Sequence, residues 1–127
     1  MRIEAYFEQV RQTIEGCPVV QTSSVAYDKR STHEGFISGE LYLVDGSILY
    51  IREFVDVETR VDRLTYVYQY VAPTLVFRYD NTGHHRRRGL PSYPHHKHEG
   101  SEKNVVAASE PDLAGVLREI EALVRLP

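Results

Sequence analysis

The sequence predicts a single α+β domain in which a helix at each end of the chain packs against an antiparallel sheet of about five strands. Apolar residues recur at helical spacing at both ends, and they alternate with polar residues between residues 19 and 80. Short turn signals separate the alternating stretches, as expected for an antiparallel meander. The 127 residues, 42% hydrophobic and 26% charged, have the size and composition of one globular domain spanning residues 1–127.

The first predicted element is an amphipathic helix over residues 2–15. Gly16 is a suitable end for this helix, and Pro18 prevents it from continuing. The apolar stripe consists of Ile3, Tyr6, Phe7, Val10 and Ile14.

Strands are expected from residue 19 to residue 80. Asp45-Gly46 is a strong signal for a two-residue hairpin, and Ala72-Pro73 interrupts the alternation near its end. The polar residues 56–62 form another turn. The predicted strands cover residues 19–29, 35–43, 49–55, 64–71 and 75–79.

A second helix closes the chain. Ser109 and Asp112 match the capping pattern in which an acidic residue follows Ser or Thr by three positions, and Pro111 suits a first helical turn. The apolar stripe consists of Leu113, Val116, Leu117, Ile120 and Val124.

Residues 83–103 show no periodicity, and about 20 residues of loop in a compact domain are usually functional or disordered. We interpret them as a functional loop. Residues 78–103 hold six Lys/Arg and three Asp/Glu, a net charge of +3, whereas the rest of the chain holds nine and 15, a net charge of −6. Five of the six histidines lie in this positive segment.

The composition also limits the compartment and the partners. Cys17 is the one cysteine, so no intramolecular disulfide can form. The charged N-terminus does not have the apolar core of a secretory signal, and no apolar run approaches the roughly 20 residues of a membrane span. We therefore expect a cytoplasmic protein with no membrane association. The overall charge of −3 argues against a protein that coats nucleic acid with its whole surface.

Two features of the strands have both a functional and a structural interpretation. Glu53 lies on the apolar face of its strand, where a buried carboxylate could act as a general acid or base. Alternatively, the strand is an edge strand, or Glu53 pairs with Arg63. Four tyrosines that share one face could stack nucleic-acid bases, although cross-strand packing is the more usual role. These are Tyr66, Tyr68, Tyr70 and Tyr79.

The strongest candidate site is the histidine-rich segment. Grouped imidazoles, guanidinium and ammonium groups suit metal-free cleavage of phosphodiesters, because one histidine can accept a proton, another can donate one, and the cations stabilise the phosphate charge. The candidate catalytic residues are Asp80, His84, His85, His95, His96 and His98, together with Glu53. The candidate substrate-binding residues are Arg78, Tyr79, Asn81, Arg86, Arg87, Arg88 and Lys97.

Two alternatives to the metal-free site remain open. His96 and His98 are two residues apart, so they point to the same side of an extended segment, and Asp80 could add an oxygen ligand for a metal such as Zn²⁺. The other alternative is a solvated loop without chemistry. The leading interpretation requires no cofactor.

The run Tyr79-Asp80-Asn81, followed by His84-His85 and by residues 94–98 (Pro-His-His-Lys-His), resembles the TumE-like family of toxins from prokaryotic toxin–antitoxin pairs. The resemblance extends over most of the chain, including Asp45-Gly46 and residues 109–113. It implies a small cytosolic effector encoded beside a helix-turn-helix antitoxin that neutralises it.

These observations together predict a toxin-like, metal-independent ribonuclease. Asp80 would orient one imidazole, and Arg78 or Lys97 would contact phosphate. A basic surface around Arg86, Arg87 and Arg88 would lie at or near the antitoxin interface. The rival functions are a non-catalytic interaction or regulatory module and a metal-dependent hydrolase.

Overall fold

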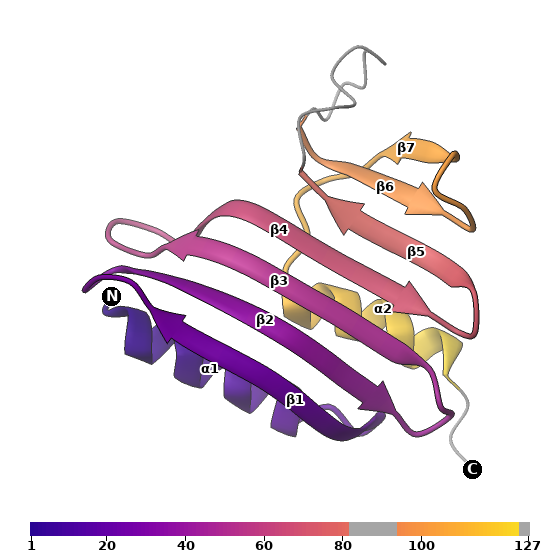
Figure 1. Ribbon diagram of the computed structural model, residues 1–127, viewed down its shortest axis with the longest axis horizontal. Coiled ribbons are helices and arrows are strands. Elements are labelled where there is room, and N and C mark those ends of the chain that lie inside the picture. The colour runs from indigo at the N-terminus through magenta and orange to yellow at the C-terminus, as the bar shows by residue number, and fades with distance from the viewer. Residues whose placement is uncertain (82–93, 125–127) are drawn as a thin grey trace.

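The structure is a computed structural model in which residues 1–81 and 94–124 are described. The described residues form two helices and one seven-stranded antiparallel sheet (Figure 1). The helices are α1 (Ile3–Glu15) and α2 (Leu113–Leu123). The strands are β1 (Val20–Lys29), β2 (Glu34–Leu43), β3 (Ile48–Asp56), β4 (Asp62–Val71), β5 (Leu75–Asp80), β6 (His96–Glu99) and β7 (Val105–Ala107).

The sheet is a meander in which every strand pairs with the one before it, in the order β1 to β7. Both helices lie on the same face of this sheet, α1 behind β1 and β2 and α2 behind β3 and β4 (Figure 1). The predicted α+β class, with a helix at each end and an antiparallel sheet between them, is confirmed.

The number of strands is higher than predicted, and the prediction of an unstructured loop over residues 83–103 is wrong for residues 96–99. These residues form β6, which pairs with β5, and β7 pairs with β6 in turn. The sequence of β6 is His-Lys-His-Glu, which has no apolar alternation and weak strand propensity. It forms a strand because β5 offers an edge to which it can hydrogen-bond. Residues 82–93 lie outside the described part of the chain.

The ends of the helices agree with the sequence in one case and differ in the other. Gly16 is the C-terminal cap of α1, as predicted. The prediction that Ser109 caps the second helix is wrong, because Asp112 is its N-terminal cap and accepts a hydrogen bond of 2.7 Å from the backbone N–H of Gly115. Asp112 directly precedes the first apolar residue, Leu113, so the helix begins where burial begins.

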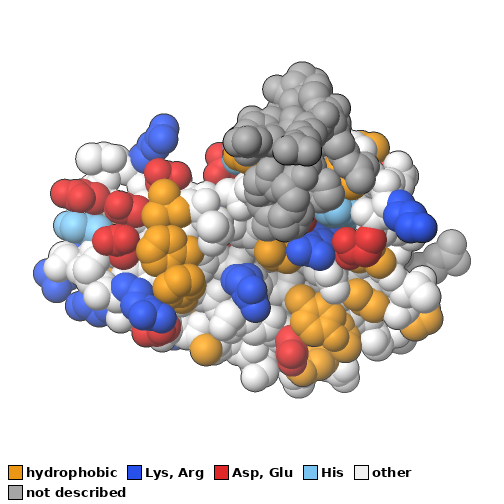
Figure 2. All heavy atoms as spheres, turned by 45° about the horizontal axis from the view of Figure 1, so that its top comes forward, with side chains coloured by type: hydrophobic (Ala, Val, Ile, Leu, Met, Phe, Trp, Pro, Cys, Tyr) orange, Lys and Arg blue, Asp and Glu red, His pale blue; other side chains and the backbone are white. Residues whose placement is uncertain are grey.

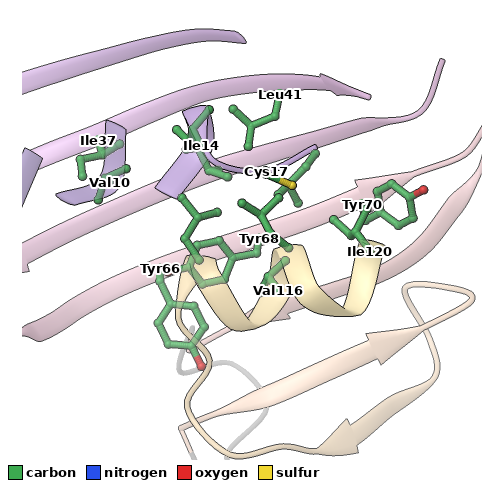
Figure 3. Packing of buried hydrophobic residues seen from close by; sticks show 14 of the residues in the cluster. Val10, Ile14, Cys17, Ile37, Leu41, Tyr66, Tyr68, Tyr70, Val116 and Ile120 are labelled. Carbon is green, nitrogen blue, oxygen red and sulfur yellow. The ribbon is translucent and has the colours of Figure 1, made fainter. Parts of the chain in front are cut away.

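The core lies between the sheet and the two helices. Tyr66, Tyr68 and Tyr70 of β4 are each at most 2% exposed, and they lie beside Val116 and Ile120 of α2 (Figure 3). These tyrosines therefore have the structural role that the sequence left open. Neither of the two helices in the described chain is long and apolar enough to span a bilayer.

Candidate functional site

Two parallel rows of side chains cross the face of the sheet that is turned away from the helices. The strand register places opposed residues on the same face, so each row can be followed from β2 to β6. One row consists of Ser38, Arg52, Val67, Asp80 and His96. The neighbouring row consists of Glu40, Tyr50, Gln69, Arg78 and His98. Figure 2 shows lysine and arginine side chains standing on this face.

The middle of these rows is hollowed. A depression of about 490 Å³ is lined by side chains from β2 to β5, among them Tyr50, Arg52, Gln69 and Arg78. Tyr50 is 37% exposed, so its ring is accessible to a ligand. The hollow thus combines an aromatic ring with two guanidinium groups, and it ends at Arg78 beside the histidines.

Asp80, His96 and His98 form a cluster at the β6 end of the two rows. The β5–β6 register pairs Asp80 with His96 and Arg78 with His98, so all these side chains share one face. The Oδ1 atom of Asp80 lies 2.6 Å from Nε2 of His96, and its Oδ2 atom lies 3.3 Å from Nε2 of His98. All three side chains are buried, with Asp80 and His96 1% exposed and His98 3% exposed.

Backbone carbonyl groups orient both imidazole rings. Nδ1 of His96 lies 3.0 Å from the carbonyl oxygen of Pro94, and Nδ1 of His98 lies 2.8 Å from that of Glu102. A carbonyl oxygen only accepts hydrogen bonds, so Nδ1 carries the proton in each ring. Each ring therefore presents Nε2 to Asp80, and in the neutral imidazole this atom bears a lone pair.

Arg78 connects the cluster to the hollow. Its Nε atom lies 3.1 Å from Oδ2 of Asp80, and its Nη1 atom lies 3.4 Å from Oε1 of Glu102. Because Arg78 also lines the hollow, an anion bound there would lie next to the cluster. The structure therefore brings four of the candidate site residues together, namely Asp80, Arg78, His96 and His98.

His95 points to the opposite face of the sheet. Its Nδ1 atom lies 2.9 Å from the hydroxyl group of Tyr66, and the two rings stack with their centroids 5.8 Å apart. Successive residues of an extended segment alternate between faces, so His95 is separated from His96 and His98 by the plane of the sheet. The candidate histidines in the described chain thus divide between two environments.

Lys97 and Tyr79 also face the helix side. The Nζ atom of Lys97 lies 2.8 Å from Oε2 of Glu119 in α2, and the Tyr79 hydroxyl donates a 2.7 Å hydrogen bond to Oε1 of Glu119. Burial alone would lower the pKa of Lys97, but its hydrogen bonds to Glu119, Tyr79 and Glu99 outweigh this effect and raise the pKa. This lysine is a charged anchor for α2 on the face opposite the cluster.

Asn81 is engaged with the backbone of β4. Its Oδ1 atom accepts a 3.0 Å hydrogen bond from the N–H of Tyr66, and its Nδ2 atom donates a 3.1 Å bond to the carbonyl of Leu64. This contact holds the end of β5 against β4, directly after Asp80. The remaining candidate residues, His84, His85, Arg86, Arg87 and Arg88, lie outside the described residues.

Glu53 forms a separate buried polar cluster under the helices. It accepts hydrogen bonds from the hydroxyl groups of Tyr6 in α1 and of Tyr68, the latter at 2.5 Å. The Nε atom of Arg63 lies 3.7 Å from its Oε2 atom. Glu53 is 2% exposed and lies on the opposite face from Asp80. The structure thus shows the pairing with Arg63 that the sequence offers as an alternative to a catalytic role, and it does not bring Glu53 to the described histidines.

This second cluster predicts a loss of stability at alkaline pH. Burial, and then the charge of Glu53, raise the pKa of Tyr6 and of Tyr68 well above the ordinary value of 10.0, against the opposing charge of Arg63. The unfolded chain releases these protons above pH 10 while the folded chain keeps them, so the free energy of unfolding should fall as pH rises. Each such tyrosine contributes a slope of about 1.4 kcal/mol per pH unit.

The measurement is urea unfolding at several pH values above 10, with tyrosinate absorbance followed in parallel. Tyr68→Phe removes one of the two tyrosines, so the free energy of unfolding of this variant should fall less steeply with pH, by about 1.4 kcal/mol per pH unit. Tyrosines that all ionise near their ordinary pKa in the folded protein would contradict the prediction.

Arg78 is the one residue lining the hollow that the sequence predictions include, and they miss the three side chains named with it above. They are Tyr50, Arg52 and Gln69. The alternation in β3 carried a signal for two of them, because burial of Leu49 and Ile51 places Tyr50 and Arg52 on the other face. Their position beside Arg78 depends on the pairing of three strands, which the alternation within one strand does not encode.

Comparison with known protein families identifies a match over nearly the whole chain. The family described as "Toxin TumE" matches residues 7–124, nearly the whole chain. No curated protein and no solved structure matches the chain.

Proposed function

The chain belongs to the TumE toxin family, and from this premise we propose that it is a ribonuclease toxin whose catalytic centre is formed by Asp80, His96 and His98. The observation that carries the proposal is the position of Arg78. This residue lines the hollow on the open face of the sheet and also contacts Asp80 at 3.1 Å. A substrate phosphate that binds Arg78 is thereby brought to the buried histidine cluster.

The hollow has the side chains that bind single-stranded RNA. Arg52 and Arg78 supply guanidinium groups for the phosphates, and the exposed ring of Tyr50 offers a surface on which a base can stack. A sheet face that carries aromatic and basic side chains is a recurrent RNA-binding surface, because splayed bases can lie flat against it. RNA is therefore the substrate that fits this face.

The cluster supplies the chemistry that phosphodiester cleavage requires. The attacking oxygen must lose a proton, and the negative charge that develops on the phosphate must be stabilised. Asp80, His96 and His98 place imidazole nitrogen and carboxylate oxygen atoms, which can accept a proton, within one small volume, and the guanidinium of Arg78 provides positive charge beside them. Glu53 and His95 lie on the opposite face of the sheet and are not part of this centre.

Membership of a toxin family implies an antitoxin partner. We propose that this partner is a helix-turn-helix protein encoded nearby, and that it inhibits the toxin by covering the basic segment with an acidic surface. Residues 78–103 carry a net charge of +3 in a chain whose overall charge is −3, so a partner can recognise this part by its charge. Arg86, Arg87 and Arg88 belong to that segment and are proposed to contact the partner.

The proposal predicts that the purified chain cleaves single-stranded RNA. Arg52→Ser should raise KM by about tenfold with little change in kcat, because Arg52 binds a phosphate at a distance from the catalytic centre. Arg60→Ser is the matched control, since Arg60 is exposed and does not line the hollow. Fragment analysis by gel electrophoresis measures both constants.

A non-catalytic binding module gives a different result in the same assay. It would retain RNA in a binding experiment, more weakly in the Arg52→Ser variant, and produce no fragments. RNA that stays intact with excess parent protein from about pH 5 to 8, with and without added Zn²⁺ or Mg²⁺, rules out the nuclease.

A further inference from the structure

We propose that Asp80, His96 and His98 bind a divalent transition-metal ion, with Zn²⁺ as the best fit. This inference builds on the proposed function, because the same side chains form the proposed catalytic centre. One ligand atom from each of the three residues can be chosen so that all three atoms lie within 4.8 Å of one another. Two imidazole nitrogens and one carboxylate oxygen are a ligand set of catalytic zinc sites, in which a fourth position stays open.

The orientation of the imidazole rings is the first argument. Histidines that ligate metals donate the N–H of their second nitrogen to a backbone carbonyl or a carboxylate, which fixes the tautomer. His96 makes this bond to Pro94 and His98 makes it to Glu102, both through Nδ1. Both Nε2 atoms then converge on the same carboxylate. Two rings held in this way are prepared for one shared ion.

The lone pairs are the second argument. With Nδ1 protonated, each neutral imidazole directs the lone pair of Nε2 at an oxygen of Asp80, at 2.6 and 3.3 Å. A nitrogen lone pair and a carboxylate oxygen repel each other at these distances unless a proton or a cation lies between the two atoms. One metal ion meets the requirement of both rings at once.

The fit requires only a small movement. In a tetrahedral site with bonds of about 2.0–2.1 Å, neighbouring ligand atoms are about 3.3 Å apart. The Oδ2 atom of Asp80 lies 3.3 Å from Nε2 of His98, and its Oδ1 atom lies 2.6 Å from Nε2 of His96. One ligand atom from each of the three residues lies within 4.8 Å of the others, so the atoms need to approach by at most about 1.5 Å to reach the tetrahedral spacing. Rotation about side-chain bonds is sufficient for the change, because β5 and β6 hold the two backbones in register.

A bound metal ion would also explain how the cluster can act on RNA although the ring nitrogens of both histidines are already occupied. Both nitrogens of His96 are engaged, one by Pro94 and the other by Asp80, and the same is true of His98 with Glu102 and Asp80. In this arrangement neither ring presents a nitrogen to an RNA hydroxyl group. A bound ion would use both Nε2 atoms and offer its open position to a water molecule or a phosphate oxygen, on the side where Arg78 enters the hollow.

The test measures metal binding by the full-length protein without RNA. After dialysis against a chelator, ZnCl₂ should raise the melting temperature by about 5–10 °C at saturating concentration, and MgCl₂ should not, because Mg²⁺ prefers an all-oxygen site. Titration with CoCl₂ should produce the visible absorption of a tetrahedral Co²⁺ site at one equivalent. Asp80→Asn and His98→Gln should each weaken the Co²⁺ binding by about 100-fold.

His95→Gln and His33→Gln are the matched controls. His95 lies on the other face of the sheet, and His33 directly precedes β2, where its Nδ1 atom lies 2.8 Å from the carbonyl oxygen of Met1 and away from the cluster. Both variants should bind Co²⁺ like the parent. Circular dichroism identifies any variant that fails to fold, and in that case the parent titration alone decides. A parent protein without the Co²⁺ absorption and without stabilisation by Zn²⁺ overturns the proposal, as does an unchanged response in folded Asp80→Asn and His98→Gln.

This outcome is separate from that of the ribonuclease assay. If the protein binds Zn²⁺ through these residues but leaves RNA intact, the metal-site proposal is supported and the ribonuclease proposal is ruled out. If the protein cleaves RNA, binds neither Zn²⁺ nor Co²⁺ and is unaffected by a chelator, the ribonuclease proposal is supported and the metal-site proposal is overturned.

Discussion

Asp80→Asn should lower the rate of RNA cleavage by about 10²- to 10⁴-fold and abolish growth arrest in cells that express the chain without its antitoxin. The reason is the position of this carboxylate at the centre of the cluster, in contact with His96, His98 and Arg78. Asparagine has the same shape, and its amide nitrogen can donate a hydrogen bond to an Nε2 lone pair. The change therefore removes the negative charge while the packing of the site is kept.

The matched control for this prediction is Glu99→Gln. Glu99 ends β6, is exposed and pairs with Lys97 at 3.1 Å, so the same chemical change is made one residue beyond His98 but outside the cluster. Cleavage and growth arrest should match those of the parent. If Asp80→Asn folds with the melting temperature of the parent and cleaves RNA at the parent rate, Asp80 is not in the catalytic centre.

Arg63→Met should lower the free energy of unfolding by about 3 kcal/mol, the second large effect expected. Arg63 is the cation nearest to Glu53 among the described ion pairs, with Nε 3.7 Å from Oε2, and the side chains are 15% and 3% exposed. Its removal leaves a carboxylate buried under α1 whose partners among the described residues are the hydroxyl groups of Tyr6 and Tyr68. Urea unfolding measures the change, and Arg60→Met, at an exposed site, should stay within about 0.5 kcal/mol of the parent.

A double variant separates the loss of charge pairing from the loss of packing. Glu53→Gln removes the charge that Arg63→Met leaves uncompensated, so the double variant should be more stable than Arg63→Met alone. A double variant whose destabilisation equals the sum of the two single changes would show that Glu53 and Arg63 are not coupled.

The sequence predicts the parts of the fold in which burial follows a period. The stripes of α1 and α2 and the alternation in β2, β3 and β4 are all seen in the structure, because the residues that pack in the core are apolar and regularly spaced. β6 escapes prediction for the opposite reason. The buried residues of β6 are His96 and His98, and they alternate with Lys97 and Glu99. All four residues are polar, so the alternation gives no hydrophobic signal.

The candidate site follows the same division. The spacing of His96 and His98 is enough to place the two rings on one side of an extended segment, and this local inference agrees with the structure. The partners of each ring depend on which strand lies beside β6 and in which register, and that is decided by pairing with β5. Proximity in the sequence places His95 with His96 and His98, although the alternation of an extended segment puts its side chain on the other face of the sheet.

The strictly sequential order of the seven described strands has a consequence for biosynthesis. Each strand needs only the strand made just before it, so the sheet can grow by one strand at a time as the chain leaves the ribosome. β6 and α2 come near the end of this order. The histidine pair therefore meets Asp80 late in synthesis, and the tyrosine face of β4 remains uncovered until α2 has been made. If translation stops early, the released chain exposes an apolar sheet and lacks the complete proposed catalytic centre, so a truncated toxin should be a substrate for cellular proteases and chaperones and should not be toxic.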